Sequence, residues 1–360
     1  MFYGLEMGYP EQSIDPDHLA RIAAIERLAG KFDAFPRLGE QLVADLRRRS
    51  IIASMAALLR LEGKGIRTED VEYAIDAMEE NRLDFGRHSN EIMEFYRTWK
   101  SHQRVDDGNG KTDWRAINLA SLAGIHTALL SGVSVHGHSA GRLRGDGLVV
   151  KAFDAEGAML GDVFEAPSPV EISKSLNETL EGVRDELAAG KWHPLLLVSW
   201  LLARLLAIQP FQTASTRSAH LVCNMLLQDL GYGHIEFRSL EEFMAEDAGN
   251  YFVALRRYRR TMGQDESGLQ EWHSFFLGCL ARQASGLEED LRRIRDEAEF
   301  APLQQRLLEL ARSRDQLTVR EAMEATVANR NTLKVHLNKL VQRGGLVRKG
   351  IGKGTWYELG

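Results

Sequence analysis

Residues 193–220 have the sequence HPLLLVSWLLARLLAIQPFQTASTRSAH, the strongest indication of a fold in the chain. Its first part, Leu195–Ile208, is apolar apart from Arg204, which predicts a buried helix. A second apolar helix is expected over Leu221–Leu230. Two apolar helices of this kind favour a mainly helical protein.

Composition indicates an ordinary globular protein. The chain has 360 residues, of which 44% are hydrophobic and 27% charged, enough for two or three domains with their own cores. No apolar run approaches the roughly 18–20 residues that span a bilayer, and Met1–Pro10 lacks the features of a signal peptide. Cys223 and Cys279, the two cysteines, lie in apolar helical patterns. We therefore expect a cytoplasmic protein without a membrane partner and with buried thiols.

Three regions are expected along the chain. Residues 1–95 form an N-terminal helical region, and residues 96–296 form a helical core that carries one β-hairpin. A joint near Glu297–Ala301 leads to the third region, residues 297–360. The expected fold class is therefore mainly α, with an all-helical core, one hairpin and a separate C-terminal domain.

The C-terminal region has the order of elements of a winged helix-turn-helix. Thr318 and Glu321 form a capping-box pattern at the start of its second helix, and residues 351–354 form a basic glycine-rich tip. Three helices followed by a basic hairpin resemble the winged-helix family along the whole segment. The expected elements are helices over Pro302–Arg312, from Thr318 and over Asn329–Gln342, and strands over Leu346–Lys349 and Thr355–Leu359.

The charge of this region favours DNA as its partner. Residues 301–360 contain eleven Lys and Arg against five Asp and Glu, so their net charge is +6 and residues 1–300 carry −12. A helix fits the major groove, and basic residues of a wing meet phosphates. Paired half-sites imply a homodimer, while a protein–protein or dimerisation module is the alternative. The expected DNA-binding residues are Arg330, Asn331, Lys334, Asn338, Arg348, Lys349 and Lys353.

The body carries a second resemblance. His193-Pro194-Leu195, the segment Gln209–His220 and the apolar helix that ends near Gly231-Tyr232 resemble the core of Fic-domain proteins, whose signature is HPFx[DE]GNGRxxR. Gly141-Arg142-Leu143-Arg144 is similar to that family's Gly-x-x-Arg turn, and the hairpin before Pro167 and Pro169 is similar to its flap. The resemblance covers about residues 30–285. It implies transfer of AMP from ATP to a hydroxyl of a target protein.

Carried over position by position, the resemblance predicts a site without intact catalytic residues. Gln209 stands at the place of the histidine base, and an amide accepts no proton near neutral pH. Thr213 replaces the carboxylate that holds Mg²⁺, and a hydroxyl is a poor ligand for a hard cation. Pro210 and Phe211, which pack, remain. AMP transfer by this chain is therefore not expected.

The phosphate-binding turn of the family is altered too. Ala214, Ser215 and Thr216 replace Gly-Asn-Gly, and their Cβ atoms oppose a positive φ. Arg217 matches the first arginine of the signature, and His220 stands at the second. Ser215 or Thr216 is expected to cap the following helix, and a capped helix start beside an arginine attracts anions. ATP binding without chemistry thus stays open, beside the alternative that these residues only cap a core helix.

Glu62-Gly63 resembles the end of the family's inhibitory motif, [ST]xxxE[GN], although Leu58 stands at its first position. The resemblance implies that Glu62 contacts an arginine of the signature. Because His220 replaces the usual arginine, either His220 or Arg217 is the expected partner, and a solvated glutamate is the alternative.

No metal site is expected. His136 and His138 flank Gly137 without a third ligand. The segment Asp106–Gly110 lacks the length and the terminal glutamate of a calcium-binding loop, so it favours a surface turn.

These patterns predict a catalytically degenerate Fic-like protein that acts as a DNA-binding regulator through its winged helix. The helical body would serve dimerisation or the sensing of a ligand or partner. One alternative is an adenylyltransferase-like enzyme with an altered site. The other is a protein-interaction module whose hairpin pairs with a partner's strand.

Overall fold

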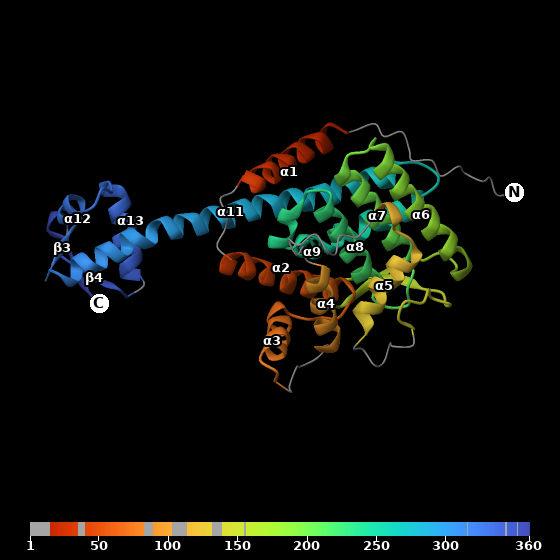
Figure 1. The fold of residues 1–360 in the computed structure, drawn as a ribbon, viewed down its shortest axis with the longest axis horizontal. Helices are drawn as coiled ribbons and strands as arrows, with labels where there is room; N and C mark the ends of the chain where they lie inside the picture. Colours follow the sequence, from red (N-terminus) through yellow and green to blue (C-terminus); the bar gives the residue numbers. More distant parts are fainter. Residues whose placement is uncertain are drawn as a thin grey trace. The chain divides into compact units, whose positions relative to one another are not determined.

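The computed structural model describes residues 15–34, 40–82, 89–102, 114–131, 139–154, 156–314, 316–342, 344–350 and 352–360. The chain divides into two compact units, a body that ends at Leu287 and a C-terminal unit that begins at Glu288 (Figure 1). Helix α11 (Ser267–Arg312) contains this boundary. The joint that the sequence suggests near residues 297–301 falls inside α11, which continues through Pro302.

The first part of the body is helical, and polar side chains fix two of its helix starts. Asp15 accepts a hydrogen bond from the backbone N–H of Asp17 at 2.9 Å, and Asn118 accepts one from Ser121 at 3.1 Å. The helices are α1 (Pro16–Ala34), α2 (Glu40–Leu61), α3 (Thr68–Glu79), α4 (Ser89–His102), the 3-10 helix η1 (Trp114–Ala116) and α5 (Leu119–Leu130).

One antiparallel hairpin interrupts the helices, as the sequence predicts. It consists of β1 (Val149–Phe153) and β2 (Met159–Glu165), which pair from Val149 with Glu165 to Phe153 with Met159. The chain then enters α6 (Pro169–Ala189), where Ser168 and Glu171 form a capping box. In chain order the hairpin therefore lies between α5 and α6.

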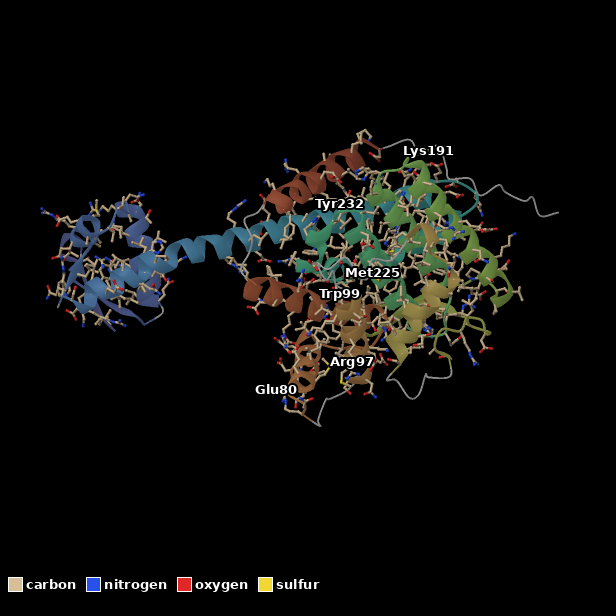
Figure 2. The ribbon with its side chains drawn as sticks, viewed as in Figure 1. Glu80, Arg97, Trp99, Lys191, Met225 and Tyr232 are labelled. Carbon is tan, nitrogen blue, oxygen red and sulfur yellow. The ribbon has the colours of Figure 1, made fainter. Side chains whose placement is uncertain are left out.

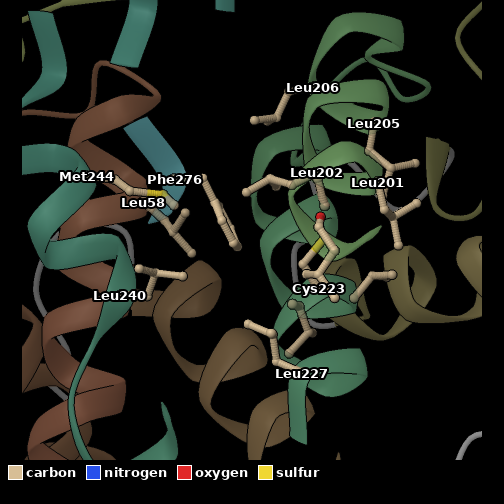
Figure 3. Packing of buried hydrophobic residues seen from close by; sticks show 14 of the residues in the cluster. Leu58, Leu201, Leu202, Leu205, Leu206, Cys223, Leu227, Leu240, Met244 and Phe276 are labelled. Carbon is tan, nitrogen blue, oxygen red and sulfur yellow. The ribbon is translucent and has the colours of Figure 1, made fainter. Parts of the chain in front are cut away.

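The centre of the body consists of two buried helices. The second half of the body contains α7 (Pro194–Ile208), α8 (Ser215–Asp229), the 3-10 helix η3 (Gly233–Phe237), α9 (Leu240–Glu246) and α10 (Ala248–Thr261), followed by α11. Every residue from Leu195 to Ile208 is buried except Trp200, and α7 packs against α8. Figure 3 shows leucines of α7 beside Cys223, with Leu58 and Phe276 contributed by α2 and α11.

The body has a polar surface around this core. Trp99 and Met225 are buried, whereas Glu80 and Lys191 are exposed (Figure 2). Within the described residues, no helix is long and apolar enough to cross a membrane.

The C-terminal unit has its own core. In this core Leu333 and Leu337, from the helix Arg330–Gln342, pack with Leu307 and Tyr357. Its helices and hairpin strands follow the order that the sequence predicts. Strand β3 is additional; its two residues pair with Tyr357 and Trp356 in a sheet of order β3-β5-β4. Beyond the end of α11, the elements are β3 (Leu317–Thr318), α12 (Val319–Ala325), α13 (Arg330–Gln342), β4 (Leu346–Lys349), η4 (Gly352–Gly354) and β5 (Trp356–Leu359).

Candidate functional site

The turn between α7 and α8 holds the residues to which the sequence assigns chemistry. Gln209 has φ 48° and Ala214 has φ 55°, so both ends of the turn adopt the left-handed conformation. This conformation is uncommon for residues with a Cβ atom. Ala214 adopts a positive φ even though its Cβ atom opposes that conformation, so the substitution of the glycine does not prevent this backbone geometry.

Ser215 stabilises the turn and does not cap α8. Its hydroxyl accepts a hydrogen bond from the Phe211 N–H at 2.8 Å and donates one to the Phe211 carbonyl at 2.9 Å. The helix starts at Ser215, and the residue before it, Ala214, has no side chain that caps. The prediction of a Ser215 cap is therefore wrong, because the hydroxyl already lies within the helix. Thr216, the other predicted cap, is likewise the second residue of α8.

Arg144 fixes the turn from the side of the hairpin. The buried guanidinium donates to the carbonyls of Gln209 at 2.8 Å, Asp146 at 2.8 Å and Pro167. The Arg144 backbone N–H donates to the Pro210 carbonyl at 2.9 Å. Because these carbonyls come from both ends of the hairpin and from the turn, Arg144 holds the three segments together.

His126 of α5 contacts the turn between α7 and α8. Its ring stacks on Phe211 with centroids 3.8 Å apart. Nδ1 accepts the Gly141 N–H at 2.9 Å, so Nε2 carries the proton and donates to the Thr213 carbonyl at 3.1 Å. Burial lowers the pKa of His126 to about 4. The ring is therefore neutral near pH 7 and acts as a fixed support.

The positions expected for a base and a metal ligand carry neither. The Gln209 side chain is buried and donates from Nε2 to the Leu206 carbonyl at 2.9 Å. Thr213 offers a hydroxyl in place of a carboxylate. Over the residues that the structure describes, no group of three or more His, Cys, Asp or Glu side chains is able to hold a metal. His136, His138 and the segment 106–110 lie outside the described residues.

Arg217 lies in a cluster of four charges, of which it is the fully buried member and the other three are partly buried. Its side chain is 1% exposed, and its Nε lies 3.1 Å from the Glu62 carboxylate. Its second guanidinium nitrogen lies 3.4 Å from Glu91 of α4. Lys64 pairs with Glu91 and lies 3.7 Å from Glu62. Two cations and two carboxylates leave the cluster neutral, so an incoming phosphate would have to displace carboxylates from Arg217.

His220 belongs to a different network. Its Nδ1 lies 3.4 Å from Glu241, and both side chains are 1% exposed. Glu241 also accepts hydrogen bonds from Asn224 at 2.7 Å and Ser54 at 2.8 Å. Burial raises the pKa of Glu241, but the hydrogen bonds from His220 and Asn224 outweigh burial and hold the pKa below its ordinary value. Arg217 and His220 are the two expected partners of Glu62. In the structure Glu62 pairs with Arg217, whereas His220 pairs with Glu241.

A cavity of about 220 Å³ lies in front of the turn. Phe153 at the hairpin's end lies so close to Gly63 that a Cβ atom there would meet its ring at 2.4 Å. A Cβ atom on Gly157 would lie 2.4 Å from the Gly65 nitrogen. The hairpin tip therefore packs on the turn after α2. The polar side chains that line the cavity are Glu62, Lys64, Lys151, Gln209, Gln212, Thr213, Ser215, Thr216 and Tyr251.

In the C-terminal unit, the predicted DNA-binding residues lie at the surface. Arg330, Asn331, Lys334 and Asn338 are exposed on α13, opposite its buried leucines. Arg348 and Lys349 are exposed on β4. The Lys353 side chain lies outside the described residues. Among the ion pairs of the described residues, none neutralises the charged members of this set.

Solved structures share this architecture. A Fic family protein from Desulfovibrio desulfuricans G20 superposes with a TM-score of 0.60 at 20% identity and covers 98% of each chain. The chain has a Fic-domain fold. Fic-1 of C. elegans (residues 134–508) gives a TM-score of 0.55 at 14% identity, covering 78% of this chain and 73% of that one. A Fic domain containing signaling protein from Bacteroides thetaiotaomicron VPI-5482 gives 0.53 at 15%, covering 73% and 95%.

Sequence comparison alone does not reach this fold, since no family model and no curated protein matches the chain. The Fic-domain fold accounts for the positions of the two central helices, the turn between them and the hairpin. Sequence reasoning missed Glu91, Lys64 and Glu241 because each comes from a different part of the chain and no local spacing links it to Arg217 or His220.

Removing Arg217 is expected to destabilise the body. In Arg217→Ala the partly buried Glu62 and Glu91 carboxylates keep only Lys64 as a cation, which should lower the free energy of unfolding by about 3–5 kcal/mol. Arg49→Ala, on an exposed position of the neighbouring α2, is the matched control and should change it by less than about 0.5 kcal/mol. Equal denaturant midpoints for the two variants would show that the cluster does not hold the helices together.

Acid is expected to destabilise the body through His126. In the unfolded chain its pKa is 6.5, whereas in the folded chain it is about 4. The unfolded state therefore binds more protons between these values, and the free energy of unfolding falls as the pH drops from about 7 to 4. Thermal unfolding at pH 7 and 5 measures this loss. His126→Asn, which keeps an acceptor and a donor, should lose less between the two pH values. An equal loss would assign the effect to another buried histidine such as His273, whose pKa burial lowers to about 3.

Proposed function

We propose that this protein is a DNA-binding regulator whose C-terminal unit acts as a winged helix and whose Fic-type site no longer transfers AMP. The observation that carries the proposal is the exposed face of α13. Arg330, Asn331, Lys334 and Asn338 cover that face, while Leu333, Leu337 and Leu340 face the core. Cations and amides on one face of a helix are the groups that reach base edges in a major groove.

The β4–β5 hairpin supplies the wing. Arg348 and Lys349 are exposed on β4, and the turn beyond them is tight: a Cβ atom on Gly350 would lie 2.1 Å from the Gly354 carbonyl oxygen. Exposed cations beside glycines suit contacts with the phosphate backbone, which add affinity without sequence information. The wing would therefore position α13, and α13 would select the sequence.

The state of the Fic-type site supports regulation over catalysis. Transfer of AMP needs a base for the target hydroxyl and a cation for the phosphates. Gln209 and Thr213 supply neither, and Arg217 is engaged by two carboxylates. The cavity of about 220 Å³ remains large enough for a small ligand. We infer that the body serves homodimerisation or ligand sensing and that two copies present their α13 helices to paired half-sites.

Binding to duplex DNA is expected to depend on α13. Arg330→Ala combined with Lys334→Ala should weaken binding to a selected duplex by about 30-fold or more, because each of the two lost base contacts is worth roughly 1–3 kcal/mol. Fluorescence anisotropy at one fixed salt concentration measures the loss. The control Arg256→Ala with Arg260→Ala, on the body, should bind as the parent does. Unchanged affinity of the α13 variant would refute the assignment of the helix.

No nucleotide transfer is expected. Incubation with ATP or other nucleotides, with Mg²⁺ or Mn²⁺ and a lysate as the source of targets, should leave every protein without an adduct by intact-mass and peptide mass spectrometry. An adduct that the parent chain forms and Arg217→Ala does not would establish an enzyme and overturn the loss of catalysis.

A further inference from the structure

Val335 is an exposed apolar residue in the middle of the polar face of α13. It is 51% exposed, whereas Leu333, Leu337 and Leu340 of the same helix are buried. The exposed residues around it are all polar or charged. A single exposed valine is common on protein surfaces, so the residues that flank Val335 decide whether it has a role.

Two exposed amides flank Val335. Asn331 precedes it by four residues and Asn338 follows it by three, so all three residues lie within an arc of about 60° on a helix with 3.6 residues per turn. Lys334 borders this stripe, and Arg330 lies one turn before Lys334. The stripe is therefore an Asn–Val–Asn row with cations at its edge.

The chemistry of this row distinguishes base pairs. An asparagine side chain donates and accepts together and matches the N6 and N7 atoms of adenine. Two methyl groups of a valine make no hydrogen bond, and the apolar group that the major groove offers is the C5-methyl of thymine. Guanine, by contrast, is matched by arginine or lysine, which stand beside the row.

We propose that α13 reads a half-site centred on A·T pairs, with Val335 packed on a thymine methyl and Asn331 and Asn338 paired with adenines. This inference rests on the proposed DNA binding. Charge complementarity selects the partner, because the cations that border the row, Arg330 and Lys334, have no carboxylate partner among the described residues and attract a polyanion. Duplex DNA with A·T pairs offers both groups: its phosphate backbone is the polyanion, and its thymines carry the methyl group.

Replacing thymine by uracil tests the inference, because it removes only the methyl group. A duplex selected by the full chain is resynthesised with one thymine at a time replaced by uracil, and affinities are measured for the parent, Val335→Ala and the control Val253→Ala. Val253 is 61% exposed on α10 of the body. Replacing the single thymine that Val335 contacts in one half-site should cost the parent and the control about fourfold in affinity, the worth of one buried methyl group.

The same replacement should cost Val335→Ala nothing further, since the contact is already absent. Circular dichroism of Val335→Ala should match the parent, as the side chain is exposed. Salt-dependent duplex binding without any uracil effect, or with an equal effect in Val335→Ala, would overturn this inference and leave the proposed function standing. Absence of duplex binding by the parent would overturn both.

Discussion

A buried guanidinium requires negative partners, and Arg217 obtains them from two segments that are distant from it in sequence. Glu62 follows α2 and Glu91 belongs to α4, while Arg217 lies in the first turn of α8. Lys64 balances the second carboxylate. Because charges at this depth are costly unless paired, the cluster holds these segments in one arrangement and fixes the edge of the cavity.

Around this cluster, the Fic-domain fold is maintained by groups that pack or bond to the backbone. The Arg144 guanidinium donates to the carbonyls of Gln209, Asp146 and Pro167. His126 stacks on Phe211, and Ser215 bonds to the Phe211 backbone. None of these interactions requires a nucleotide. The site therefore keeps its architecture although Gln209 and Thr213 offer neither a base nor a carboxylate. The stability of the fold does not depend on the catalytic groups of the family that the sequence resembles.

Local patterns predicted much of the fold and only part of the site. The apolar run Leu195–Ile208 and the leucine spacing in α13 indicate their helices because burial follows helical periodicity. Strand β3 escaped prediction, since two residues carry no periodic signal and owe their conformation to pairing with β5. The partners of Arg217 and His220 escaped for a similar reason: Glu91 and Glu241 reach them only through tertiary packing.

Selection from a random duplex library at two salt concentrations, followed by sequencing of the retained DNA, tests the central claim most directly. We expect enrichment of a palindromic site whose retention weakens as the salt concentration rises, because phosphate contacts release counterions. Equal recovery of all sequences, or no retention at the lower salt concentration, would contradict a DNA-binding regulator. The C-terminal unit would then be assigned to protein binding.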